Sequence, residues 1–333
     1  MIVIEKAVLH ILDLVSGVTV YSDEELTLDE GIGEFLLRHI EKSLASQDAK
    51  FGEFYEDSAC KQQIMAYFSG EKDLVTLSKE LAHTLEEALI HTEDKKSTDL
   101  IMADIRVDEE RKLVVFQCSS HMGFVHQVNH TEQGIRNDII HHHAIMPNPA
   151  QRMEEFAFID AKSLAISFAG KKYVLDGCPV YILPEVLLEC SQTASPKEAI
   201  KSIRKTAERV AKDFEQNEVA TAAAVKNYIA ENAQNSEMLD PVAAGREIFK
   251  DQPSMQAEYE ERIKEAGMAE PVRVDQEVTA KKMSKHRLRT DTGIELSIPT
   301  DYFDNTEFLE FYNHEDGTLS IMLKQISNIT NRG

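Results

Sequence analysis

Six of the twelve histidines fall between positions 121 and 143, and this cluster is the first feature that could do chemistry. Imidazole is both the commonest metal ligand and the usual general base. A metal site needs two or three ligands on one face, which in a strand means positions two apart. If residues 139–146 form a strand, His141 and His143 share a face and are its only pair able to chelate together. The six are His121, His126, His130, His141, His142 and His143.

A third metal ligand is not evident from the sequence. No HExxH or CxxC pattern supplies one, although His121, His126 or Asp138 could approach in space. No GxSxG motif or other activated nucleophile accompanies the histidines. The cysteines are scattered without metal-binding spacing, and we expect them to be reduced and mostly buried. They are Cys60, Cys118, Cys178 and Cys190.

We therefore interpret the histidine segment as a half-buried strand whose imidazoles face solvent or a partner. We expect no catalytic residue, no bound metal and no cofactor. A metal-dependent nuclease or hydrolase that uses the histidine cluster with nearby carboxylates remains the second alternative function.

Phosphate binding by lysine and arginine is the other chemistry that the residue types indicate. Residues 196–214 are predicted to form a helix, because Ser195, Pro196 and Glu198 make a capping box. On a helical wheel, six cations lie within an arc of about 140°, opposite an apolar side. These cations are Lys197, Lys201, Arg204, Lys205, Arg209 and Lys212.

A second basic cluster lies in KKMSKHRLR, immediately before a predicted strand. Cations that face phosphate release counterions and make binding salt-dependent. Neither basic segment interleaves aromatic residues, so stacking on bases and sequence-specific readout are not indicated. The alternative remains that both are ordinary solvated faces, the first offset by Glu198, Glu208 and Asp213. The second cluster consists of Lys281, Lys282, Lys285, Arg287 and Arg289.

The pattern of predicted elements favours an α+β fold. Strands are expected near residues 2–12, 99–128, 138–146, 155–159 and 163–177, with three helices between 29 and 90. Helices are expected again at 196–214, 219–234 and 254–266. The last 65 residues return to strand in EPVRVDQEV, KHRLRTDTGIELSIP and FLEFYNHEDGTLSIMLKQI, with a turn at residues 314–317. We predict an N-terminal α+β domain (1–190), a helical segment (191–268) and a small β-rich C-terminal domain (269–333).

Composition restricts the partners. No apolar run of about 18 residues appears, so no membrane contact is expected, and the start lacks a signal peptide, which predicts a cytoplasmic location. The formal charge of −22 opposes indiscriminate attraction to nucleic acid, so any DNA contact must use a local basic surface. Residues 22–57 carry eleven Asp or Glu against Arg38, Lys42 and Lys50.

Several stretches together resemble the bacterial nucleoid-associated protein family of the NdpA/YejK type, especially its members from Gram-positive bacteria. They are AVLHILDLVSGVTVYSDEEL, FLLRHIEKSLAS, KLVVFQCSSHMGFVHQV, GIRNDIIHHHAIMPNPAQRMEEFAFI, YILPEVLLECSQTASPKEAI and FLEFYNHEDGTLSIMLKQISNITNR. The resemblance runs from about residue 2 to residue 332. It implies a cytoplasmic protein that associates with the nucleoid, in which Ile145, Met146 and Pro147 end a structural strand that leads to a loop containing Gln151.

The function predicted from these features is that of a non-enzymatic nucleoid-associated protein that binds DNA non-specifically through the two basic segments. Arg204, Lys205 and Arg209 would contact phosphates, and Lys281, Lys282 and Arg287 would extend the track. The first alternative is an acidic adaptor that DNA-processing proteins recruit to the nucleoid through residues 23–57. The sequence leaves open whether DNA contact is direct, which proteins are partners and whether the chain forms a homodimer.

Overall fold

The computed structural model describes residues 1–93, 95–132, 134–303, 305–314 and 318–330. The chain divides into two compact units, Met1–Thr193 and Ala194–Gly333. The predicted α+β class is confirmed, because the structure combines helices with a seven-stranded antiparallel sheet and small C-terminal hairpins. The three-part division at residues 190 and 268 stays a prediction about which segments fold on their own.

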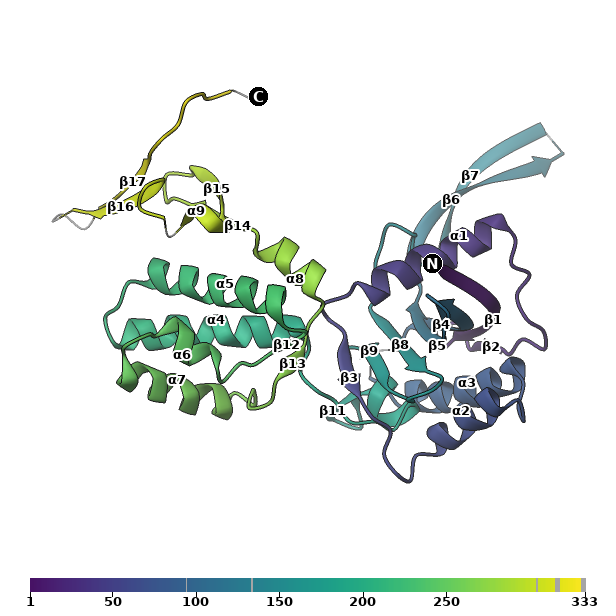
Figure 1. Cartoon of the computed structure of the whole chain (residues 1–333). Helices are drawn as coiled ribbons and strands as arrows, with labels where there is room; N and C mark the ends of the chain where they lie inside the picture. The colour runs from purple at the N-terminus through teal and green to yellow at the C-terminus, as the bar shows by residue number, and fades with distance from the viewer. Residues whose placement is uncertain (94, 133, 304, 315–317, 331–333) are drawn as a thin grey trace. The chain divides into compact units, whose positions relative to one another are not determined.

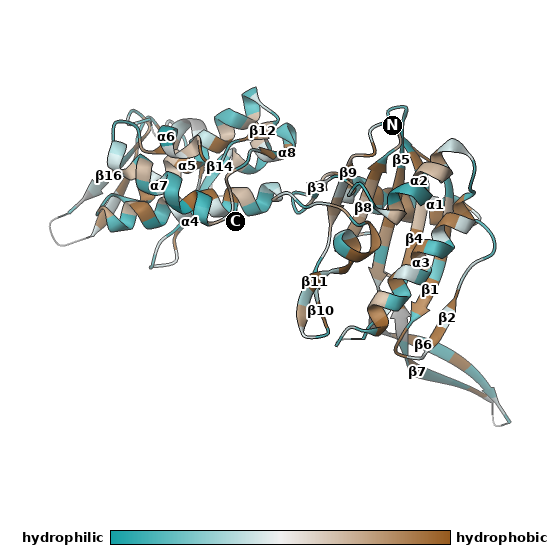
Figure 2. Cartoon of the chain, turned by 90° about the horizontal axis from the view of Figure 1, so that it is seen from below, coloured by the Kyte–Doolittle hydropathy of each residue, from teal (hydrophilic) through white to brown (hydrophobic). Residues whose placement is uncertain are grey.

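A seven-stranded antiparallel sheet forms the centre of the first unit (Figure 1). Its order is β2-β1-β4-β5-β8-β9-β3. The strands are rich in apolar residues, which appear brown in Figure 2. Their bounds are β1 (Ile2–Asp13), β2 (Val18–Val20), β3 (Lys50–Gly52), β4 (Ser97–Val107), β5 (Glu110–Ser119), β8 (Glu155–Asp160) and β9 (Ile166–Ala169).

Helices cover both faces of this sheet. Helix α1 (Glu30–Leu44) lies on one face, and α2 (Ala59–Ser69), α3 (Leu74–Ile90) and the π-helical segment η1 (Ile182–Leu187) lie on the other (Figure 1). β4 is therefore buried along nine consecutive residues. A run buried on both faces reads as continuous apolar sequence, as the LIMA segment of β4 does. A short hairpin of β10 (Lys172–Leu175) and β11 (Cys178–Tyr181) precedes η1.

The histidine segment forms a separate two-stranded hairpin, β6 (His121–Thr131) and β7 (Gly134–Ile145), which we call the arm. The arm projects from the body of the first unit (Figure 1). KLVVFQCSSHMGFVHQV was expected to continue as strand, but the chain leaves the sheet at Ser120, between β5 and β6. A strand is confirmed for the triple-histidine segment, and it is longer than expected.

The base of the arm is fixed by contacts to α1. His39 Nε2 hydrogen-bonds to the carbonyl of Pro147 at 3.3 Å, and Lys42 donates to the carbonyl of Pro149. The loop that follows closes on itself, since Asn148 N donates to Gln151 Oε1 at 2.7 Å and Gln151 N donates to the Asn148 carbonyl at 2.7 Å. This is the strand and glutamine-containing loop that the family resemblance implies.

Four helices build the core of the second unit: α4 (Pro196–Asp213), α5 (Glu218–Asn235), α6 (Ala244–Ile248) and α7 (Pro253–Glu265). Tyr259 of α7 is fully buried in this core, and its hydroxyl donates to the Pro241 carbonyl at 3.0 Å. Gly245 of α6 permits this packing, because a Cβ at that position would lie 2.3 Å from the Tyr259 ring. A two-residue pair, β12 (Met238–Leu239) with β13 (Val272–Arg273), ties the ends of the helical segment together.

Among the described residues, the C-terminal part of the second unit contains two helices, α8 and α9, that were not expected. EPVRVDQEV was predicted to be a strand, but only Val272 and Arg273 are in strand, and α8 (Gln276–Met283) follows. The reason is local: the Asp275 side chain accepts from Val278 N at 2.8 Å and caps the helix. The remaining elements are β14 (Lys285–Arg289), β15 (Glu295–Pro299), α9 (Thr300–Phe303), β16 (Leu309–Asn313) and β17 (Leu319–Leu323). Residues 315–317 of the predicted turn at 314–317 lie outside the described residues.

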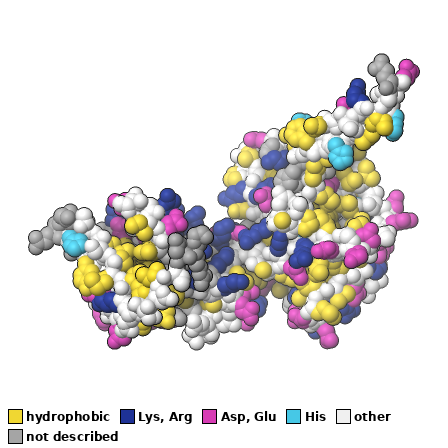
Figure 3. Space-filling view, turned by 90° about the horizontal axis from the view of Figure 1, so that it is seen from above, with side chains coloured by type: hydrophobic (Ala, Val, Ile, Leu, Met, Phe, Trp, Pro, Cys, Tyr) yellow, Lys and Arg dark blue, Asp and Glu magenta, His cyan; other side chains and the backbone are white. Residues whose placement is uncertain are grey.

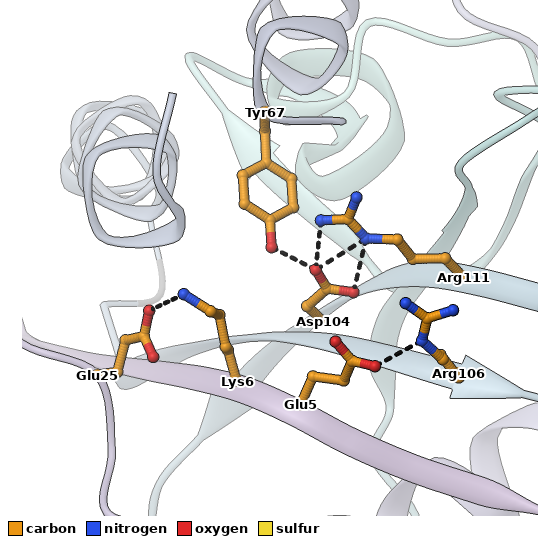
Figure 4. A network of polar contacts seen from close by, with 7 residues as sticks. All are labelled: Glu5, Lys6, Glu25, Tyr67, Asp104, Arg106 and Arg111. Carbon is orange, nitrogen blue, oxygen red and sulfur yellow. Dashed lines mark hydrogen bonds and ion pairs between the residues drawn. The ribbon is translucent and has the colours of Figure 1, made fainter. Parts of the chain in front are cut away.

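A buried ion pair joins the sheet to α2 (Figure 4). Asp104 of β4, 2% exposed, accepts from Arg111 of β5 at 2.7 and 3.0 Å and from the Tyr67 hydroxyl of α2. The Arg111 guanidinium also lies 5.2 Å from the Tyr67 ring centre and 5.3 Å from that of Phe68. Hydrogen bonding to Asp104 raises the pKa of Arg111, so the cation is retained at all ordinary pH values. This network satisfies the charges that burial of β4 would otherwise leave unpaired.

We predict that Asp104→Ala destabilises the protein by about 3 kcal/mol, because it leaves Arg111 and the Tyr67 hydroxyl without their shared acceptor. Urea unfolding measures the change. Arg106→Ala is the control, since its ion pair with Glu5 on the same sheet is about half exposed and should contribute less than about 1 kcal/mol. Equal losses for the two variants would contradict the role assigned to Asp104.

Candidate nucleic-acid interface

Helix α4 begins where the sequence predicts, because its first turn is closed reciprocally. Ser195 Oγ accepts from Glu198 N at 3.2 Å, and Glu198 Oε2 accepts from Ser195 N at 2.9 Å. Pro196 occupies the first turn. The helix buries one side against α5 and α7, and the apolar residues of that side fix which side faces solvent. Its fully buried residues include Ala199, Ile203, Ala207, Val210 and Ala211.

The six cations of α4, which we call the α4 stripe, are all exposed. From Lys197 to Lys212 they extend over about 22 Å of helix, which is comparable to the length of roughly six base pairs. The exposed side of α4 thus carries positive charges along nearly its whole length.

The three carboxylates that could neutralise the α4 stripe are largely engaged elsewhere. Glu198 is held by the capping box, and Asp213 accepts from Arg262 of α7 at 2.6 Å. Glu208 pairs within the stripe, at 3.6 Å from Arg204. Four further stripe cations have no carboxylate at ion-pair distance within the part of the chain that the structure describes. These are Lys201, Lys205, Arg209 and Lys212.

The second cluster spans α8 and β14. Lys281 and Lys282 lie in the last turn of α8, where cations are favoured by the helix dipole. In β14, Lys285, Arg287 and Arg289 share one face by alternation and are all exposed. Arg289 lies 3.9 Å from Glu295 of β15, a distance that contributes little at such an exposed pair.

The other face of β14 is anchored in the unit. His286 is 6% exposed and stacks on Phe303, with ring centres 3.8 Å apart. Burial, and then the charge of Lys226, lower the pKa of His286 to about 4, so it is neutral at pH 7. A neutral, packed imidazole holds the basic face of β14 toward solvent.

Lys226 of α5 is a cation that the sequence reasoning missed. It donates to the Lys285 carbonyl, and burial followed by the charge of Arg287 lowers its pKa. It therefore lies beside the second cluster although it comes 55 to 63 positions earlier than the residues of that cluster. Lys226 stands alone among alanine and valine on a helix of low amphipathicity, so no sequence pattern linked it to residues 281–289.

Helix α5 lies between the two basic segments in the packing of the second unit. It packs against α4 on one side and against α8 on the other. Both segments thus lie on the surface of one unit and are connected through a shared helix.

The histidine cluster does not assemble as a metal site within the described residues. His141 and His142 lie on opposite faces of β7, since His141 pairs with Phe124 and His142 with Gly123. Asp138 is engaged by Asn129 at 2.6 Å and by Arg136 at 3.0 Å. Among the described residues, no group of three His, Cys, Asp or Glu could hold a metal ion. The structure does not describe the side chains of His121 and His143. The predicted pairing of His141 with His143 therefore stays a prediction.

Three of the four cysteines are buried, and all four are unpaired thiols, as expected. Burial raises the pKa of Cys190 to about 12 and raises those of Cys60 and Cys118 further. A thiol that remains protonated at pH 7 is a poor nucleophile. Cys178 alone is exposed.

Asp99 of β4 is a buried carboxylate whose pKa is shifted toward neutral pH. Burial, and then the charge of Asp13, raise the pKa of Asp99 to about 6. For Asp13, burial acts in the same direction, but hydrogen bonds from Ser16 and Ser97 outweigh it and lower its pKa. Asp99 is 9% exposed in the sheet, where it pairs in register with Cys118.

The fold and surface define an acidic protein of two units with an exposed cationic helix. The model of the family described as nucleoid-associated protein YejK matches residues 8–330. The chain therefore belongs to this family of nucleoid-associated proteins, and the predicted resemblance is confirmed. No curated protein matches the chain. Among the described residues, no helix is long and apolar enough to cross a membrane.

The raised pKa of Asp99 predicts a pH dependence of stability. Because the folded state binds this proton more tightly than the unfolded chain, the contribution of Asp99 is most favourable below about pH 4 and is lost as pH rises through about 6. Asp99→Asn should therefore stabilise the protein by roughly 2 kcal/mol at about pH 8, and the gain should shrink as pH falls from about 6 to 4.

Urea unfolding across this pH range measures the Asp99 effect. Asp13→Asn should act in the opposite direction at about pH 8, because the pKa of Asp13 is lowered and its ionised form is stabilising. A gain from Asp99→Asn that does not vary with pH would show that the amide acts by packing and not by removing a buried charge.

Proposed function

We propose that the protein is a non-enzymatic nucleoid-associated protein that binds DNA non-specifically through the α4 stripe and the cluster at residues 281–289. The observation that carries the proposal is the state of the α4 carboxylates: two of the three nearest ones are occupied by the helix cap and by Arg262. A chain of net charge −22 has abundant acid to neutralise a basic helix, yet this helix keeps four cations without a carboxylate partner among the described residues.

Phosphate is the ligand that such a surface suits. Arg204 and Lys205 lie on one turn of a rigid helix, and Arg209 lies about one turn further on. They can therefore donate charge-assisted hydrogen bonds to phosphates along a nucleic-acid backbone. Lys281, Lys282 and Arg287 extend the positive surface, and Lys226 adds a charge beside them. The stripe carries no aromatic side chain for base stacking, which favours backbone contacts and binding without sequence preference.

Enzymatic activity is not part of the proposal. The thiols of Cys60, Cys118 and Cys190 are held protonated by burial, and the carboxylate of Asp138 is occupied by Asn129 and Arg136. The histidines instead alternate with apolar side chains along the arm, an arrangement that suits packing better than catalysis.

A second candidate function is an adaptor whose acidic surface at residues 23–57 binds a basic protein. Ten of the eleven carboxylates there are exposed. Three of them already have partners within the chain, in the pairs Asp23–Lys79, Glu25–Lys6 and Glu34–Arg38. The remaining exposed carboxylates include Glu24, Glu30, Glu41, Glu53, Glu56 and Asp57.

The decisive prediction concerns charge reversal on the α4 stripe. The triple variant Lys201→Glu/Arg204→Glu/Lys205→Glu should bind a labelled duplex at least about tenfold more weakly at low salt. The slope of log affinity against log salt should fall by about 0.9 for each phosphate that the variant no longer neutralises, because fewer counterions are released. Filter binding at several salt concentrations measures both quantities.

The matched control is Arg246→Glu/Lys250→Glu/Lys264→Glu, which changes the net charge equally at three exposed cations of α6, α7 and the loop between them. Loss of affinity in the stripe variant alone would support contact through α4, whereas equal losses would indicate an effect of net charge only. If the wild-type protein does not bind the duplex at low salt, direct DNA binding is wrong.

The adaptor function predicts a different result. Glu53→Lys/Glu56→Lys/Asp57→Lys should abolish capture of a basic protein partner from a lysate while leaving duplex affinity undiminished, because these residues lie in the first unit. Partner capture that survives this variant would argue against the acidic surface.

A further inference from the structure

A stripe of cations has to be kept clear of acid in a chain that carries 58 Asp and Glu against 36 Lys and Arg. Figure 3 shows the two kinds of side chain interspersed over the visible face. A carboxylate that pairs with a cation of the α4 stripe would neutralise it and would also repel phosphate. Groups that hold such carboxylates elsewhere therefore act on the stripe without belonging to it.

Asp213 is the carboxylate best placed to neutralise the C-terminal end of the α4 stripe. It lies in the last turn of α4, four residues after Arg209 and next to Lys212. Residues four apart on a helix are neighbours on its surface, so a released Asp213 side chain can reach Arg209. The helix dipole disfavours a carboxylate at this end of a helix, so a released Asp213 would be stabilised by any cation within reach.

Arg262 of α7 holds Asp213 away from the α4 stripe. Its Nη1 donates to Asp213 Oδ2 at 2.6 Å, and its Nε donates to Glu258 Oε1 at 2.6 Å. Glu258 lies one turn earlier on α7, so the guanidinium is oriented by its own helix while its other side reaches across to α4, which packs against α7. The Arg262 side chain is 26% exposed and that of Asp213 is 47% exposed, so the pair lies at the edge of the surface that carries the stripe.

We propose that Arg262 is a positioning residue for DNA binding, which holds the Asp213 carboxylate away from Arg209 and Lys212 and so keeps this end of the α4 stripe available to phosphate. The inference rests on the proposed DNA-binding function. Arg262 acts through Asp213 and not by touching DNA. Without the guanidinium, the Asp213 carboxylate pairs with Arg209, and one phosphate contact of the stripe is lost.

Duplex binding by full-length Arg262→Gln tests the proposal. Affinity at low salt should fall about threefold, and the slope of log affinity against log salt should fall by up to about 0.9, because a neutralised Arg209 releases fewer counterions. The matched control is Lys264→Gln, which removes an equal charge two residues further along α7. Lys264 pairs with Glu260 of its own helix at 2.6 Å, so this variant should keep the wild-type affinity and slope.

A double-mutant cycle with Arg209→Gln separates positioning from a simple loss of charge. If Arg262 acts through Asp213, Arg209→Gln should cost about threefold less affinity in the Arg262→Gln background than in the wild type, because Arg209 is already paired there. If Arg262 only adds positive charge, Arg209→Gln costs the same in both backgrounds.

Thermal unfolding should show that the variants stay folded, and Arg262→Met, which keeps the packed stem without the charge, repeats the test if the glutamine variant does not. Wild-type affinity in Arg262→Gln, an equal loss in Lys264→Gln, or equal costs of Arg209→Gln in the two backgrounds would overturn the proposal. If the charge reversals on the stripe weaken binding and Arg262→Gln does not, this inference alone is wrong. A wild-type protein that does not bind the duplex would overturn the DNA-binding function and this inference with it.

Discussion

Burial of β4 and β5 on both faces is the constraint on which the first unit depends. α1 on one side and α2 and α3 on the other cover most residues of these strands, so each buried polar group on them needs a partner within the protein. The pairing of Asp104 with Arg111 and Tyr67 meets this need on one face. The burial of Asp99 is compensated less completely by partners within the protein, and the pKa of Asp99 is raised as a result.

The same constraint explains why the arm separates from the sheet. Beyond Ser120 the chain alternates histidine and polar residues with apolar ones, and a strand of that pattern cannot be buried on two faces without unpaired imidazoles. The segment instead pairs with itself and leaves the body, and the chain re-enters the core at Met153 and β8. His39 and Lys42 of α1 hold the returning chain by its carbonyls.

Much of α4 could be predicted from the sequence because its determinants are local. The capping box fixes the start, and the wheel then fixes which side is buried, so the exposure of the cations follows directly. Residues 270–278 were misjudged for a related reason: the cap at Asp275 outweighed the β-branched residues around it. Lys226 and the occupation of Asp213 by Arg262 depend on contacts between distant segments, which one sequence does not reveal.

The α4 stripe and the arm differ in chemistry. A cationic helix acts by releasing counterions and tolerates little nearby acid. The arm instead exposes large apolar side chains such as Phe124, Ile135 and Ile139. The cations lie on the second unit, and the exposed apolar side chains lie on an arm of the first. If the α4 stripe contacts DNA, each contact releases counterions, so association with DNA should weaken steeply as the salt concentration rises.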